Sequence, residues 1–222
     1  MRYFLLFLCC FTIAHAAENL LLCVVTAHRP QSYLESLVTG LREQNANFVV
    51  VDVDNSTEGE YLNLQESPYE CTVGTVSCPA QRQGVDLVRG LQFCAGTSNA
   101  SYVGLIEDDM LPCNESIHTM EQTLSKLSDF KTARFAKFSR ATIFPRAHVA
   151  LYTQYVMRHV HETPHDILLN FEWASGDDYI HPRSLFAHQG QISTIEERND
   201  PLFIKTYSSI REEVCEGPLV GK

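Results

Sequence analysis

Three consecutive carboxylates, Glu107, Asp108 and Asp109, are the residues of this 222-residue sequence that are best suited to chemistry. They directly follow residues 102–106, an apolar segment typical of a buried strand. Adjacent carboxylates in such a place repel one another and resist desolvation, so a fold normally keeps them beside a compensating cation. Mg²⁺ and Mn²⁺ take carboxylate oxygens and complete their shells with substrate phosphates. We therefore expect a divalent metal here, with a solvated acidic turn as the alternative.

The elements that must position this triplet alternate between strand and helix. Apolar runs predict strands at residues 20–26, 48–53, 102–106 and 133–138. Helical spacing predicts helices at 32–44, opened by a capping box from Ser32 to Glu35, at about 80–93, after a cap at Asn114, and at 149–159. The order predicts an α/β fold, with a mainly parallel central sheet in one domain.

Ligands of such sheets bind outside the carboxyl ends of the strands. Three predicted strand ends carry polar residues: Thr26, His28 and Arg29 after the first strand, Asp52 and Asp54 at the end of the second, and the acidic triplet after the third. We expect these three segments to line one crevice.

The N-terminus indicates a secreted chain. Arg2, the apolar run 3–13 and the small residues Ala14 and Ala16 predict a signal peptide over residues 1–16, followed by a globular domain over 17–222. The run is short for a bilayer span, although a retained anchor is the alternative, and we expect no membrane span in the mature chain. Loss of Arg2 changes the net charge from −10 to −11. This charge argues against nucleic acid as a partner. The predicted signal peptide leaves the endoplasmic reticulum, the Golgi and the exterior as locations.

The cysteines fit an oxidising compartment. Six remain after the signal peptide, and six allow 15 pairings. Local closure predicts Cys71–Cys78 and Cys94–Cys113, which leaves Cys23 with Cys215; a buried free thiol at Cys23 is the alternative. Three N-x-S/T sequons, at Asn55, Asn99 and Asn114, are candidate glycosylation sites.

The acidic triplet after a strand resembles the short metal-binding motif of GT-A-fold glycosyltransferases. The wider pattern resembles two families, the N-acetylgalactosaminyltransferase of GPI-anchor glycans and the N-acetylglucosaminyltransferase IV family. The resembling segments are residues 83–90, 102–112, 141–145, 164–169 and 182–194, the last with Ser-Leu-Phe-Ala-His-Gln-Gly at 184–190. The resemblance implies a single GT-A-like, Rossmann-like domain.

The resemblance also implies roles for individual residues. Asp109 is the expected metal ligand, with Glu107 and His188 as further ligands, and Glu107 or Asp108 reaches the donor ribose or a metal-bound water. Asp166 is the expected catalytic base, with Asp177 and Asp178 as competing candidates. The residues expected to hold the donor are Thr26, His28, Arg29, Asp52, Asp54, Arg82 and Asp86. Structural alternatives are a satisfied histidine at His188, a helix cap at Asp166, and ordinary surface residues at Arg29 and Arg82.

The implied activity is inverting, metal-dependent transfer of an N-acetylhexosamine from a UDP-sugar to a glycan acceptor, with Mn²⁺ or Mg²⁺ as cofactor. The chain differs from the GPI-glycan enzyme because residues 138–144 continue without the membrane hairpin of that family. This difference argues against a membrane-embedded acceptor. The mature chain is also short for a GT-A enzyme, so two other functions stay open: an inactive secreted module that binds carbohydrate or nucleotide sugar, and a disulfide-stabilised interaction protein. The sequence does not predict the oligomeric state.

Overall fold

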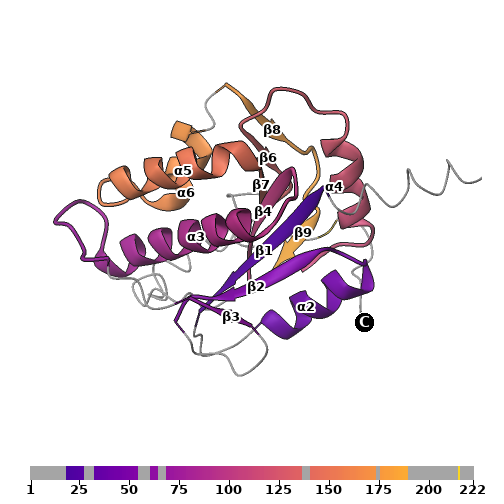
Figure 1. Cartoon of the computed structure of the whole chain (residues 1–222), viewed down its shortest axis with the longest axis horizontal. Coiled ribbons are helices and arrows are strands. Elements are labelled where there is room, and N and C mark those ends of the chain that lie inside the picture. The colour runs from indigo at the N-terminus through magenta and orange to yellow at the C-terminus, as the bar shows by residue number, and fades with distance from the viewer. Residues whose placement is uncertain are drawn as a thin grey trace, which may run out of the picture.

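A seven-stranded sheet forms the centre of the computed structural model, which describes residues 19–27, 33–54, 61–64, 69–136, 141–173, 176–189 and Cys215. The strand order is β3-β2-β1-β4-β7-β6-β8 (Figure 1). The strands of this sheet are β1 Leu20–Thr26, β2 Phe48–Asp52, β3 Leu62–Asn63, β4 Tyr102–Glu107, β6 Thr132–Arg134, β7 Ala141–Pro145 and β8 Asp178–Ile180. A separate two-stranded sheet pairs β5 (Met110–Pro112) with β9 (Phe186–His188).

The sheet is mainly parallel. Strands β3, β2, β1 and β4 run in one direction, β7 runs against both β4 and β6, and β8 is parallel to β6. The predicted α/β class with a mainly parallel central sheet is therefore confirmed. Because β2, β1 and β4 are parallel neighbours, their carboxyl ends meet at one edge of the sheet.

Helices cover both faces of the sheet (Figure 1). Helices α3 (Cys78–Thr97), α5 (Arg146–His159) and α6 (His165–Ile167) lie on one face, and α2 (Leu34–Glu43) and α4 (Ser116–Leu124) on the other. Side chains of β1 alternate between the two layers: Leu20, Leu22 and Val24 join the α2 and α4 core, whereas Leu21, Cys23 and Val25 join the α3 and α5 core. This alternation decides which residues at the strand ends can meet.

The same alternation corrects two predicted disulfides. Cys71–Cys78 is confirmed, but Cys23 pairs with Cys94 and Cys113 pairs with Cys215. Cys23 points from β1 into the layer that contains α3, where Cys94 is also buried. The predicted Cys94–Cys113 and Cys23–Cys215 bonds, and the free thiol at Cys23, were therefore wrong.

Most predicted elements have the expected type, with shifted ends. Helix α2 begins at Leu34, after Tyr33 in the cap position predicted for Ser32, which lies outside the described residues. The predicted cap at Asn114 was wrong: α4 begins at Ser116, and the side-chain oxygen of Gln44 accepts the Ile117 N–H at 3.1 Å. A residue distant in sequence therefore caps this helix.

Several predictions fall outside the described residues: the signal peptide, His28, Arg29, the sequon at Asn55 and residues 190–194. The strand predicted at 133–138 ends at Arg134 as β6, and residues 137 and 138 are also outside. Within the described part of the chain, we find no helix with the length and apolarity needed to cross a membrane.

Candidate active site

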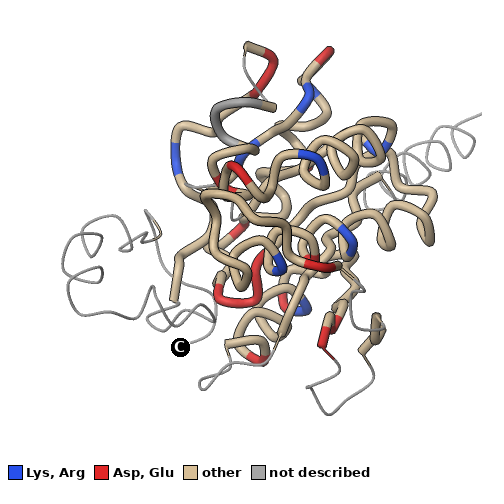
Figure 2. The backbone as a smooth tube through the Cα atoms, turned by 90° about the vertical axis from the view of Figure 1, so that its left-hand side faces the viewer, with Lys and Arg blue, Asp and Glu red and all other residues tan. Residues whose placement is uncertain are grey.

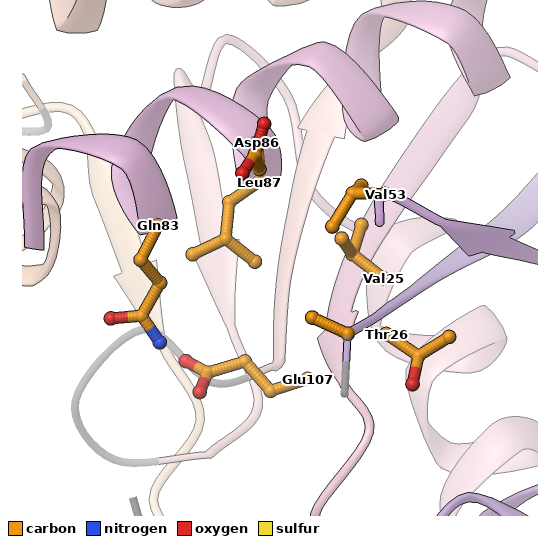
Figure 3. Close-up of a pocket in the computed structure, with 8 residues that line it drawn as sticks. Val25, Thr26, Val53, Gln83, Asp86, Leu87 and Glu107 are labelled. Atoms are coloured by element: carbon orange, nitrogen blue, oxygen red, sulfur yellow. The ribbon is translucent and has the colours of Figure 1, made fainter. Parts of the chain in front are cut away.

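A pocket opens at the carboxyl edge of the sheet, between the ends of β1, β2 and β4 and helix α3 (Figure 3). Its lining residues are Val25, Thr26, Ala27, Val53, Gln83, Asp86, Leu87 and Glu107. It contains about 390 Å³ of empty space, part of which is open solvent. Most of the wall is apolar, and the Gln83 amide and the Glu107 carboxylate face each other across one end. Of the three segments predicted to line one crevice, the described lining includes Thr26 and Ala27 from the first, Val53 from the second and Glu107 from the third.

Glu107 is in this pocket because of its position in β4. Val103 and Leu105 point into the α3 and α5 core, and Glu107, two residues further on, points to the same side. Its neighbour in register on β1 is Val25, another lining residue. The half-buried Glu107 carboxylate therefore faces the part of the pocket that lies beneath α3.

Asp108 points to the other side of the sheet. Its carboxylate is 2% exposed, and Oδ2 accepts a hydrogen bond from the Thr26 hydroxyl at 2.7 Å. The Thr26 hydroxyl points away from Glu107 in Figure 3. Other atoms of Thr26 thus line the pocket, while its hydroxyl donates a hydrogen bond to the acidic turn, which consists of Asp108 and Asp109.

Asp109 lies beside His188. The turn at Asp108 and Asp109 leads into β5, which pairs with β9 so that Met110 is opposite His188. Asp109 Oδ2 and His188 Nε2 are 3.2 Å apart, and each side chain is 7% exposed. The Gln189 N–H also donates to the Asp109 carbonyl oxygen at 2.8 Å. The structure therefore brings together two residues, 79 positions apart, that the sequence predicted as metal ligands.

Of the other described residues predicted to bind the donor, Asp52, Asp54, Arg82 and Asp86, only Asp86 lines the pocket. Asp52 ends β2 fully buried, and its Oδ1 accepts the N–H of Asp54, which is itself exposed. On α3, Asp86 lines the pocket and forms an ion pair with Arg89 at 3.4 Å, while Arg82 is exposed.

Burial raises the pKa of Asp86, and the nearby carboxylate of Asp54 adds to this rise, although Arg89 opposes it. The half-buried Asp86 carboxylate in the pocket lining is therefore more easily protonated than an exposed aspartate.

Asp166 lies in α6, next to the helix that forms the pocket roof. The preceding residue, His165, packs so closely on Gly84 of α3 that a Cβ at Gly84 would meet the His165 Cβ at 3.1 Å. Gly84 directly follows the lining residue Gln83. Asp166 itself is half-buried, and its Oδ1 accepts the Ile167 N–H at 3.1 Å.

A buried pair that the sequence analysis did not single out anchors α6. His165 Nε2 and the Tyr152 hydroxyl oxygen lie 2.8 Å apart, and both side chains are buried. Burial lowers the pKa of His165 from 6.5 to about 4, although the nearby Asp166 carboxylate opposes this effect. Burial also raises the pKa of Tyr152. Both groups are therefore neutral at pH 7.

Asp177 and Asp178, the competing candidates for the base, are engaged elsewhere. Asp177 forms an ion pair with Lys131 at 3.0 Å, and Asp178 forms one with Arg134. The Asp178 and Arg134 side chains are only 18% and 13% exposed. Both acids thus have basic partners at the β6 and β8 side of the sheet.

The register also separates Asp178 from the pocket. Through β6 and β7, Ile180 of β8 is in register with Leu105 of β4. Asp178 lies two residues before Ile180, and Glu107 lies two residues after Leu105. Four residues correspond to about 13 Å along the strands. This separation favours Asp166 over Asp178 as the base, an assignment that stays a prediction.

The structure adds Gln83 and Leu87 to the site. Both lie within the segment 83–90 that carries the family resemblance. Their place in the pocket lining depends on how α3 packs over the strand ends. An amide and a leucine on a helix have no distinctive spacing, so only the fold identifies them.

No family model matches the chain, and no curated protein matches it. Among solved structures, it is similar to a glycosyltransferase involved in the glycosylation of the major capsid of PBCV-1, with 11% identity and a TM-score of 0.48, over 81% of this chain and 97% of the other. It is also similar to A197 from STIV, with 9% identity and a TM-score of 0.42, over 79% and 86% of the two chains. The function of this chain is therefore inferred from its own residues.

Proposed function

We propose that this protein is a metal-dependent, inverting glycosyltransferase of the secretory pathway, which transfers an N-acetylhexosamine from a UDP-sugar to a glycan acceptor. The main support is the divergence of three successive carboxylates at the end of β4. Glu107 faces the pocket, Asp108 binds Thr26, and Asp109 meets His188. We assign Glu107 to donor binding and Asp109 to metal binding.

The pocket suits a nucleoside. Val25, Val53 and Leu87 supply an apolar wall for a base, and Gln83 and Glu107 supply a few polar groups at one end. This combination of apolar wall and few polar groups is typical of small-molecule sites. A carboxylate such as Glu107 accepts hydrogen bonds from ribose hydroxyls, and a glutamine amide can both donate to and accept from a base.

The described lining of the pocket offers a diphosphate no positively charged side chain. The described lining contains the acids Asp86 and Glu107 and no Lys or Arg. On the side of the molecule that Figure 2 shows, acidic and basic positions of the described residues are interspersed along the backbone.

Asp109 and His188 fit a divalent ion. Two neighbouring ligands of an octahedral ion at about 2.1 Å lie roughly 3 Å from each other, and the Asp109 oxygen and His188 nitrogen are 3.2 Å apart. A hydrogen bond also explains this distance. No set of three or more His, Cys, Asp or Glu side chains within the described ranges could hold a metal, so the other ligands would come from phosphate or water. When bound, Mn²⁺ or Mg²⁺ supplies Lewis-acid stabilisation of the departing diphosphate.

Asp166 is the proposed base. Its carboxylate would take the proton of the acceptor hydroxyl as that oxygen attacks the anomeric carbon from the face opposite the diphosphate. The close packing of His165 on Gly84 holds α6 against the pocket helix, and the Tyr152–His165 pair fixes α6 to α5.

The proposal is tested by UDP release and sugar transfer from UDP-N-acetylglucosamine and UDP-N-acetylgalactosamine, with Mn²⁺ and oligosaccharide acceptors. Asp109→Asn should lower kcat/KM by about 100-fold or more, because it removes charge stabilisation from the leaving group. The matched control is Asp129→Asn, an exposed aspartate with φ of 54°, a conformation that asparagine tolerates. Equal loss in both variants, or turnover unaffected by Asp109→Asn, would contradict the proposal.

A second function has one observation in its favour. Since no third His, Cys, Asp or Glu among the described residues completes a metal-holding group with Asp109 and His188, the chain is also compatible with an inactive module that binds nucleotide sugar. That function predicts UDP binding without turnover of any UDP-sugar, whatever the metal. The turnover experiment therefore separates the two.

A further inference from the structure

We propose that Thr26 is a positioning residue: its hydroxyl holds the acidic turn so that Asp109 stays against His188. The sequence analysis placed Thr26 among the donor-binding residues, and the structure points its hydroxyl elsewhere. The inference rests on the proposed function only where it concerns metal and donor.

The bond joins two strands at the point where their pairing stops. The last pair in register between β1 and β4 is Val25 with Glu107. Thr26 and Asp108 are the residues that follow these two along the sequence. Side chains alternate along a strand, so these two point to the same side, away from the pocket. The Thr26 hydroxyl therefore ties the end of β1 to the first residue after β4.

Burial gives this bond its strength. Thr26 is 3% and Asp108 2% exposed, and the oxygens are 2.7 Å apart. A hydroxyl that donates to a carboxylate forms a charge-assisted bond, which is stronger than a neutral one and stronger still away from water. Loss of the Thr26 donor would cost free energy because the buried Asp108 carboxylate would have one hydrogen bond fewer. The turn should therefore shift until this carboxylate accepts another hydrogen bond.

The acidic turn is thus held from two sides. Thr26 holds Asp108 from β1, while the Gln189 N–H holds the Asp109 carbonyl oxygen from the end of β9. Asp108 and Asp109 are adjacent, so a shift of the first carboxylate moves the backbone of the second. Loss of the Thr26 bond should therefore loosen the Gln189 hydrogen bond as well as the contact with His188.

The first test follows backbone amide exchange in three variants. Thr26→Val keeps the side-chain shape and removes the donor, and Thr26→Ser restores it. The control is Thr132→Val, the same change at a fully buried threonine whose hydroxyl has no hydrogen-bond partner in the described structure. We expect exchange of the Gln189 amide to be about 10-fold faster in Thr26→Val, and unchanged in the other two. The Leu105 amide, in the central strand β4, reports global opening, so an acceleration at Gln189 that exceeds the one at Leu105 isolates the local effect.

The second test measures UDP binding by calorimetry, with MnCl₂ and with EDTA. Thr26→Val should weaken the Mn²⁺-dependent binding about 10-fold, and Thr26→Ser should restore it. Wild-type exchange at Gln189 in Thr26→Val, or a Thr26→Ser variant as impaired as Thr26→Val, would overturn the positioning role. If the wild type binds no UDP with Mn²⁺, the proposed function fails, while the exchange experiment still decides the role of Thr26.

Discussion

The buried His165 makes the stability of this protein depend on pH in a predictable direction. Its pKa is about 4 in the folded protein and 6.5 in an exposed chain. Between these values the unfolded chain binds more protons than the folded one. Stability is therefore fully present above pH 6.5 and is lost as the pH falls toward 4. Below pH 4 both forms are protonated and no further loss comes from this group.

The structure also sets the size of the effect. A pKa difference of about 2.5 units corresponds to about 3 kcal/mol of unfolding free energy, lost at about 1.4 kcal/mol for each pH unit. His165 is 8% exposed and packs on Tyr152 and Gly84, so solvent does little to reduce this penalty. Asp86 contributes with the opposite sign, because its raised pKa lets the folded state hold a proton more readily. A variant is therefore needed to isolate the histidine.

His165→Gln is that variant, since its amide can still pair with the Tyr152 hydroxyl but does not titrate. Urea unfolding between pH 4 and 7.5 can be followed by fluorescence of Trp173, the single tryptophan, whose ring lies 5.4 Å from that of Tyr152. We expect the wild type to lose about 3 kcal/mol more than His165→Gln over this range. Equal pH dependence of the two proteins would refute the reasoning.

Further predictions concern three other features. Removal of Cys23–Cys94 by two alanines should cost about 4 kcal/mol, against about 2.5 kcal/mol for Cys71–Cys78, because their separations are 71 and 7 residues; urea unfolding showing the reverse order would contradict this. Thr132→Val should leave unfolding free energy unchanged or raise it by about 1 kcal/mol, since a buried hydroxyl without a partner in the described residues is replaced by a methyl group; a clear loss of stability would argue against it. Asn99 and Asn114 are exposed, so each should carry a glycan in the protein secreted from eukaryotic cells; mass spectrometry after glycan release would show both asparagines unmodified if this is wrong.

The elements around the pocket could be predicted because each one satisfies a local rule. The seven residues of β1 form an unbroken apolar run, and α3 repeats apolar residues at helical spacing. The edge at which Glu107 and Asp109 lie then follows from the rule for parallel sheets. Strand β7 was not predicted because its five residues form too short a pattern to be distinguished from a loop.

The missed features depend on contacts between distant parts of the chain. Short loops close at the least entropic cost, so local pairing favoured Cys94–Cys113, but the side to which Cys23 points decides its partner. The Gln44 cap of α4 likewise depends on the packing of α2 against β5. Sequence spacing does not encode such contacts.

If a nucleotide binds at the end of β4 with a divalent ion held by Asp109 and His188, as proposed, it should stabilise the folded protein against heat. The most direct measurement is the thermal stability of the purified protein with UDP, in Mn²⁺ and in EDTA. At 100 times the dissociation constant, UDP with Mn²⁺ should stabilise the wild type by about 2.7 kcal/mol, or raise Tm by roughly 5 to 10 °C. EDTA or Asp109→Asn should remove most of this shift. A wild-type protein whose Tm is the same with and without UDP and Mn²⁺ would contradict the account.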